Sequence, residues 1–390
     1  MLAALLPLLR GAVIVLFLPL VVVMPVVYFR ALRPRRGTTE WMRRLDPPKF
    51  RPIQGQTLHM ADLPWGILAV LCAAAVYLIV LFFRSGWFLQ DAPWLFFSQA
   101  AFYYLPRLLL SAALGAGVFL LLRGWYAHGS VGFWAAVLSP LLFHDRLAEG
   151  TALVFALWFF WLWMTAEPRA CWFRRAVFLL PAGLCYGVGL VLCWPSVFLA
   201  PLFVAGYVRT LVFRWRGGVH RVRNLLLSLV LTALLCLCGV LGVWILYGFL
   251  SGTNRELGNL RRLSYYGQML PTLLVQAKGL LVRPALQETV IYGDVFPVLL
   301  GLGTAIPLLH GLLKRRDERC LYILLLLLGL AAMWLVSGAY LLPLGLLLAF
   351  GWVWESCAAR RCGGAVWGLA LGLGAFLLCD TLFIILGRFA

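Results

Sequence analysis

Residues 64–83 read PWGILAVLCAAAVYLIVLFF, and this apolar run decides the fold class of the chain. A transmembrane helix needs roughly 20 consecutive apolar residues, and this run supplies them without a charged side chain. Similar runs recur along the 390 residues, of which 63% are hydrophobic and only 12% charged. Backbone groups in lipid must be hydrogen-bonded within their own segment. The sequence therefore predicts an all-α, polytopic integral membrane bundle.

Short basic clusters between the apolar runs account for the net charge of +19. Lysine and arginine gather in the cytoplasmic loops of membrane proteins, so the clusters orient the chain and argue against nucleic-acid binding. Their alternation predicts about 12 transmembrane helices with both ends outside. The expected helices are residues 5–28, 64–83, 103–122, 131–143, 150–163, 176–193, 197–213, 225–250, 295–313, 321–336, 341–354 and 365–386.

The same pattern divides the chain into four parts. Residues 1–62 hold an N-terminal transmembrane helix and a basic cytoplasmic segment, and residues 63–250 form a transmembrane core. Residues 251–292 form the largest outer loop, in which the apolar stretch 269–281 reads as a helix lying in the interface. Residues 293–390 supply the C-terminal transmembrane helices. None of the ten cysteines falls in an expected outer loop, so no disulfide framework is expected.

The first expected outer loop reads SGWFLQDAPWLFFSQ over residues 85–99 and contains one carboxylate, Asp91. The side chains of Trp87, Phe88 and Trp94 stand close to it in sequence. A carboxylate partly walled by rings is suited to accept a proton from a hydroxyl or amine. An acid within an interfacial aromatic belt explains the same residues, so both interpretations stay open on the residues alone.

A second polar turn, His144-Asp145-Arg146-Leu147-Ala148-Glu149, joins two apolar runs. The first run, residues 131–143, makes roughly 20 Å of helix, which is short for a membrane span. The turn is therefore expected to lie inside a cavity. A capped or ion-paired turn is the alternative interpretation.

Several basic residues fall on the expected outer side, against the usual charge bias. Arginine and lysine there are suited to bind an anionic group such as a lipid phosphate. Snorkelling of single side chains to the interface is the alternative. These residues are Arg84, Arg107, Arg146, Arg261, Arg262, Lys278 and Arg283.

Four stretches, taken in order, resemble the GT-C superfamily of membrane glycosyltransferases. They are QDAPWLFFSQ at 90–99, LSPLLFHDRLAE at 138–149, GLCYGVGLVLCWP at 183–195 and AYLLP at 339–343. The first two are most similar to the GPI mannosyltransferase type. The overall layout also resembles the protein O-mannosyltransferase and lipid A aminoarabinose transferase branch.

The resemblance implies a GT-C-like bundle with an outer-face cavity, in which residues 63–250 are the catalytic core. It implies transfer of a sugar such as mannose from a polyprenyl-phosphate donor to a lipid, glycan or protein acceptor. Asp91 would be the base that engages the acceptor, and Glu149 or Asp145 the second acid. No cofactor is expected, and a divalent metal stays open. The expected substrate-binding residues are Trp94, Arg107, His144, Asp145, Arg146, Glu149, Arg261, Arg262, Lys278 and Tyr340.

The chain also departs from the family pattern. Gln90 precedes Asp91, where many relatives have a second acid, and Trp194 and Ala339 stand where relatives have basic residues. A divergent or inactive member is therefore an alternative, as are a lipid or solute transporter and a non-catalytic scaffold of an envelope-glycan pathway. The expected location is the bacterial plasma membrane, or the endoplasmic reticulum if the chain is eukaryotic.

Overall fold

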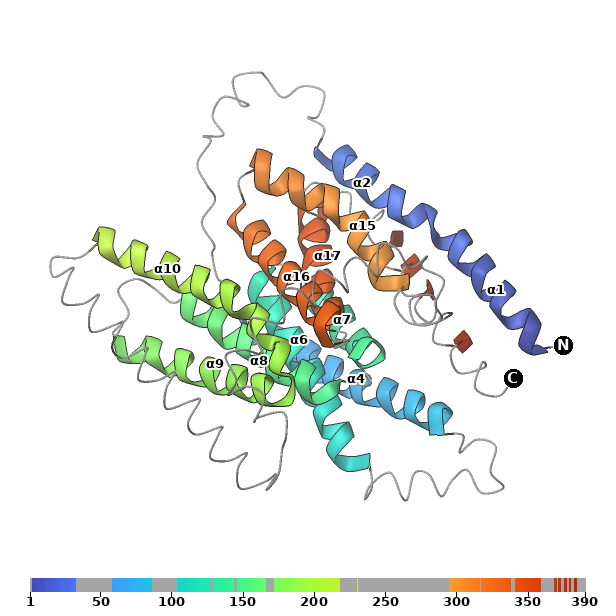
Figure 1. Ribbon diagram of the computed structural model, residues 1–390, viewed down its shortest axis with the longest axis horizontal. Coiled ribbons are helices and arrows are strands. Elements are labelled where there is room, and N and C mark those ends of the chain that lie inside the picture. The colour runs from blue at the N-terminus through green and yellow to red at the C-terminus, as the bar shows by residue number, and fades with distance from the viewer. Residues whose placement is uncertain are drawn as a thin grey trace.

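The computed structural model describes residues 2–32, 58–85, 104–126, 129–143, 146–165, 172–217, 295–315, 317–337 and 341–358, with isolated residues 230, 368–369, 371–372, 375–376, 379 and 382–383. These residues are almost entirely helical and include no strand (Figure 1). Four stretches among them are long and apolar enough to cross a membrane: Leu8–Ala31, Asp62–Phe82, Leu105–Trp125 and Leu147–Thr165. The all-helical membrane class expected from the sequence is thus confirmed at this level.

The helices follow the apolar runs closely. Their bounds are α1 Leu2–Phe17, α2 Pro19–Leu32, α4 Asp62–Ser85, α6 Leu105–Trp125, α7 Gly129–Phe143, α8 Leu147–Thr165, α9 Trp172–Leu192, α10 Ala200–Gly217, α15 Val295–His310, α16 Glu318–Ser337 and α17 Leu342–Ala358. A 3₁₀ helix, η3, covers Trp194–Leu199, and a π-helical turn, η4, covers Gly311–Arg315. The expected helix at 225–250, apart from residue 230, and the expected interfacial helix at 269–281 lie outside the described residues.

Helices α4, α6, α7, α8 and α9 form the first packed group. A Cβ atom added to Gly115 of α6 would lie 2.8 Å from the Ala73 Cβ of α4, so the two backbones approach closely. The Ser111 hydroxyl donates a hydrogen bond to the Ala73 carbonyl at 3.4 Å. Arg123 near the end of α6 meets Asp62 at the start of α4. The two helices are therefore antiparallel.

Helices α2, α15, α16 and α17 form the second group. In Figure 1 the blue helix α2 runs beside the orange helix α15, although more than two hundred residues separate them in the chain. The Met24 side chain packs against Gly303 of α15, and the Tyr28 hydroxyl lies 3.0 Å from the His310 ring nitrogen. The N-terminal helix therefore packs on the C-terminal helices.

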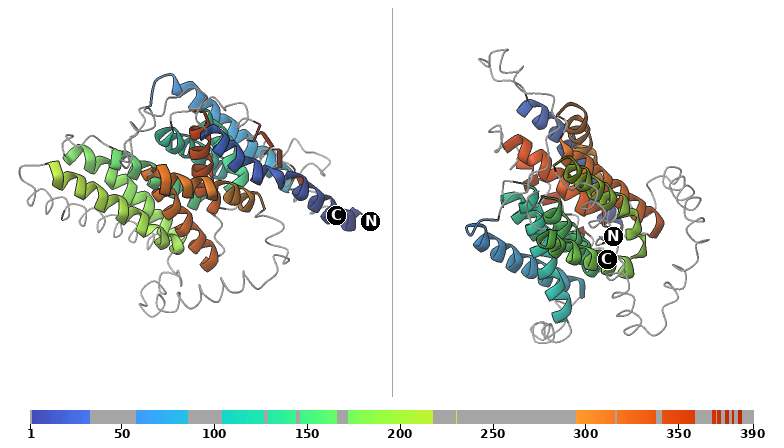
Figure 2. Two further views of the ribbon diagram at one scale, coloured as in Figure 1. Left: turned by 90° about the horizontal axis from the view of Figure 1, so that it is seen from above. Right: turned by 90° about the vertical axis from the view of Figure 1, so that its left-hand side faces the viewer.

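The two groups lie side by side in both views of Figure 2 and share one core of buried side chains. A Cβ on Gly329 of α16 would lie 2.7 Å from the Phe198 carbonyl oxygen of η3, so α16 presses directly onto that turn. The turn is held by the Tyr186 hydroxyl, which donates to the Ser196 carbonyl at 2.8 Å. The Tyr126 hydroxyl, just after α6, donates to the Leu348 carbonyl of α17.

Candidate functional site

The turn between α7 and α8 carries two of the residues singled out in the sequence. The Arg146 guanidinium forms an ion pair with Glu149 at 3.0 Å, and their side chains are 42% and 14% exposed. Glu149 lies in the first turn of α8, where the helix dipole favours a negative charge. The pair is the ion-paired turn that the sequence allowed as an alternative. Being local and half in solvent, it contributes only about 0.2–0.5 kcal/mol to stability.

The start of α6 lies at the same end of the first helix group as this turn. The Thr151 hydroxyl of α8 donates to the Leu110 carbonyl of α6 at 3.3 Å, which fixes the two helix starts side by side. Arg107 is exposed in the first turn of α6. Because α4 is antiparallel to α6, its last residue, Ser85, lies at this end too. We call it the turn end.

The described part of the chain therefore brings together Arg107, Arg146 and Glu149 of the expected site at one end of one helix group. The remaining expected site residues lie outside the described residues. They are Asp91, Trp94, His144, Asp145, Arg261, Arg262, Lys278 and Tyr340. Ser85 and Tyr104, which flank the segment containing Asp91 and Trp94, are both described and both lie at the turn end.

Comparison with known proteins adds no assignment. No protein-family model, curated protein or solved structure matches this chain. The chemistry of the site therefore rests on its own residues.

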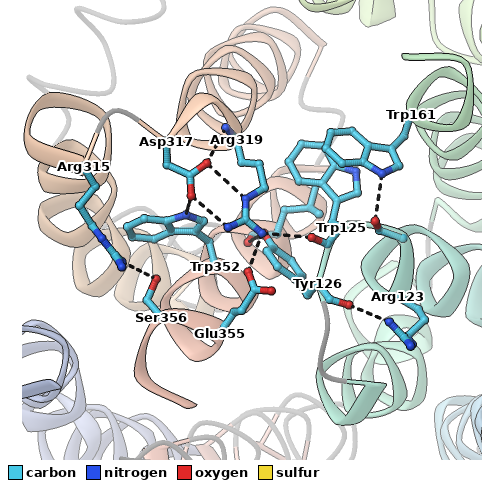
Figure 3. Close-up of polar contacts among 12 residues, drawn as sticks. Arg123, Trp125, Tyr126, Trp161, Arg315, Asp317, Arg319, Trp352, Glu355 and Ser356 are labelled. Atoms are coloured by element: carbon cyan, nitrogen blue, oxygen red, sulfur yellow. Dashed lines mark hydrogen bonds and ion pairs between the residues drawn. The ribbon is translucent and has the colours of Figure 1, made fainter. Parts of the chain in front are cut away.

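The opposite end of the molecule holds a polar cluster that sequence reasoning did not single out (Figure 3). Its centre is Arg319, in the first turn of α16. The Arg319 guanidinium contacts the Asp317 carboxylate at 3.0 Å and the Glu355 carboxylate of α17 at 2.5 Å. It also donates to the Trp125 carbonyl at the end of α6, at 3.2 Å, and lies 5.8 Å from the centre of the Tyr126 ring. One side chain thus joins three helices.

Asp317 completes this arrangement as the cap of α16. Its carboxylate accepts a hydrogen bond from the Arg319 backbone N–H at 3.0 Å and from the Trp352 indole N–H at 3.0 Å. Burial raises the pKa of Asp317, but the hydrogen bonds and charge of Arg319 and the Trp352 N–H outweigh it and hold that pKa below its ordinary value. The carboxylate is therefore ionised at neutral pH and fully engaged.

Two further ion pairs lie at the same end. Arg123 of α6 meets Asp62 of α4 at 3.0 Å, and Arg209 of α10 forms a pair with Glu318 beside Asp317. We call this the basic end, and the basic loops of the sequence make it the expected cytoplasmic one. All of these carboxylates are compensated by arginine, so the cluster is built to hold helix ends together rather than to exchange protons with a substrate.

The sequence contained a signal for this cluster. Residues 315–319 read RRDER immediately before an apolar run, a cluster of acids and arginines that suits capping and ion pairing at a helix start. The surrounding arginines place these acids on the expected cytoplasmic side, away from the expected outer-face site. Among the described residues, no group of three or more His, Cys, Asp and Glu side chains is placed to hold a metal ion.

Proposed function

We propose that this protein is a membrane glycosyltransferase of the GT-C type, with about 12 spans and an outward-facing cavity. It takes a sugar from a polyprenyl-phosphate donor and transfers it to an acceptor on the outer face. The observation that supports this most directly is the turn end. Ser85 and Tyr104, on either side of the segment with Asp91, lie at the same end as Arg107, Arg146 and Glu149. The proposal is that the segment between them brings Asp91 to the face that carries these basic groups.

In this mechanism the acceptor hydroxyl oxygen attacks the anomeric carbon of the donor sugar. Asp91 takes the hydroxyl proton as the bond forms. The bond between the anomeric carbon and the donor phosphate oxygen breaks, and the phosphate leaves with the electron pair. Basic side chains on this side, among them Arg107 and Arg146, stabilise the charge on the departing phosphate.

Transfer by the purified full-length protein, reconstituted in liposomes, tests the proposal. Polyprenyl-phosphate sugars are supplied in one arm and the matching nucleotide sugars in the other, with a panel of lipid and peptide acceptors. Transfer from the lipid-linked donor alone is the expected result. Transfer from neither donor, with protein that remains folded, would favour the scaffold. Donor lipid that crosses the bilayer unchanged would favour a transporter.

For Glu149, we expect a substitution to reduce activity without reducing stability. Replacing Glu149 by Gln should shift the melting temperature hardly at all, because the pair with Arg146 is local and partly exposed. If Glu149 is the second acid of the site, transfer should fall by roughly tenfold or more, the cost of losing one hydrogen bond to a charged group. Initial rates over a range of acceptor concentrations check this.

The matched control is Glu318→Gln, which makes the same chemical change at the basic end. That variant breaks the buried pair with Arg209, so it should lower the melting temperature. Its folded fraction should keep normal transfer. If Glu149→Gln instead lowers stability and leaves transfer unchanged, Glu149 is a structural residue.

A further inference from the structure

Two opposite charges fall inside the first and the last transmembrane helices expected from the sequence. Asp380 is the one acidic residue within any of the expected helices, and it belongs to the last of them, residues 365–386. The first expected helix, residues 5–28, has a single charged side chain, Arg10. In the structure Arg10 is only 3% exposed, within a helix that is otherwise apolar. A charge in such a place is costly unless an opposite charge compensates it.

The two helices contact each other. The Phe17 ring at the end of α1 packs edge-on against the Phe376 ring, with 5.4 Å between their centres. The short red ribbon pieces between residues 368 and 383 lie along α1 in Figure 1. The chain runs through α1 and α2 toward the basic end, where Tyr28 lies against Trp352 of α17. After α17 it leaves that end to reach Phe376, so the two segments are antiparallel.

Arg10 lies on the inward-facing side of α1. It precedes Phe17 by about two helical turns, which places both residues on the same face. Val13 and Ile14, between them on that face, pack against the buried core. Val15, on the other side of the helix, is exposed. The buried face of α1 is therefore the one that carries the arginine.

The last segment has a buried face as well. Asp380 itself lies outside the described residues, but its neighbours on the helix define the faces. Leu369 and Phe376 are buried, whereas Leu371 and Leu382 are exposed. Position 380 is one turn after Phe376, and helical spacing places it on the buried side. We therefore expect its carboxylate on the face that meets α1.

The positions of the two charges along the helices also match. Because the segments are antiparallel, both residues lie beyond the contact between Phe17 and Phe376, on the side away from the basic end. At 1.5 Å per residue, Arg10 is about 10 Å from Phe17 along its helix, and position 380 is about 6 Å from Phe376. The long arginine side chain can span the remaining offset of about 4 Å.

We propose that Arg10 and Asp380 form an intramembrane ion pair that holds the N-terminal helix against the C-terminal one. Each side chain supplies the opposite charge that the other needs away from water. The pair gives α1 a specific partner, which its apolar residues alone do not, since they suit lipid equally well. This inference does not depend on the glycosyltransferase proposal.

Chemical cross-linking of the full-length protein tests whether the two residues meet. The Arg10→Lys variant keeps the positive charge, and its amine can be joined to an adjacent carboxylate by dicyclohexylcarbodiimide, an apolar reagent that takes up the water released. Mass spectrometry of the digested protein should find an amide bond between positions 10 and 380. Adding Asp380→Asn should abolish that bond. Folded Arg10→Lys protein that forms no such bond, or that joins position 10 to another acid, would overturn the pair.

Thermal unfolding in detergent tests whether the pair matters for the fold. Arg10→Leu and Asp380→Leu should each lower the melting temperature, because each leaves one charge uncompensated. The double variant should lose much less than the sum of the two losses. As a control, Arg10→Leu with Asp62→Asn should show additive losses, because Asp62 pairs with Arg123. Additive losses for Arg10 and Asp380, or melting temperatures equal to that of the parent protein, would contradict the proposal.

Discussion

Replacing Asp91 by Asn should lower sugar transfer by about 10²–10⁴-fold, the range that a general base contributes. The amide cannot take the acceptor proton, yet it has the same shape and can still accept a hydrogen bond. Donor binding should therefore change far less than the rate of the chemical step. The measurement is single-turnover transfer by reconstituted protein, with donor binding measured separately, so that chemistry and affinity are not confused.

Two variants sharpen the result for Asp91. Asp91→Glu keeps the acid but moves it by one methylene, so partial activity is expected. Asp46→Asn makes the same chemical change in the expected cytoplasmic segment and should transfer at the parent rate. If Asp91→Asn turns over as fast as the parent protein, Asp91 is not the base and the mechanism fails. In that case the aromatic-belt interpretation of residues 85–99 would account for the stretch.

The bounds of the helices could be predicted well because they depend on local composition. The apolar run at 64–83 became a helix from Asp62 to Ser85, and the run at 103–122 a helix from Leu105 to Trp125. Charged residues near the ends of the runs, such as Asp62 and Arg123, mark where the chain leaves the apolar environment. The apolar run and the charged residues at its ends are all local, so the sequence alone is enough to predict the bounds of each helix.

The packing partners of the helices could not be predicted in the same way. In a membrane the side chains that face lipid and those that face another helix are equally apolar, so composition does not separate them. In α2, Met24 is 1% exposed and packs on α15, while Val26 two residues later is 57% exposed. Nothing in the local sequence marks that difference, and the pairing of α2 with α15 appears only in the fold.

The polar contacts at the helix ends differ in the same way. Those between residues close in sequence can be predicted, and those between distant helices cannot. The Arg146–Glu149 pair spans three residues and was foreseen as one of two interpretations of the turn. The pair between Arg123 and Asp62 joins residues 61 positions apart, and that between Arg319 and Glu355 joins residues 36 apart. Such contacts depend on which helix ends meet, so the local sequence does not predict the cluster at the basic end.

Replacing Arg319 by Met should give a large loss of stability. The variant would leave Asp317 and Glu355 without the cation they share, and removing one partner of a buried ionic group costs about 3–5 kcal/mol. It would also leave the Trp125 carbonyl without its donor, so α6, α16 and α17 would lose their common contact. Thermal unfolding in detergent, followed by circular dichroism, measures the loss.

A rescue variant identifies the cause. Adding Asp317→Asn and Glu355→Gln to Arg319→Met removes both buried negative charges, so part of the lost stability should return. Arg107→Gln serves as the control, because Arg107 is exposed and its loss should change stability by only about 0.5 kcal/mol or less. If the rescue variant is no more stable than Arg319→Met, packing of the long Arg319 side chain matters more than its charge. If Arg319→Met melts with the parent protein, the three helices are held by their apolar contacts alone, and the cluster is a consequence of the fold rather than a cause.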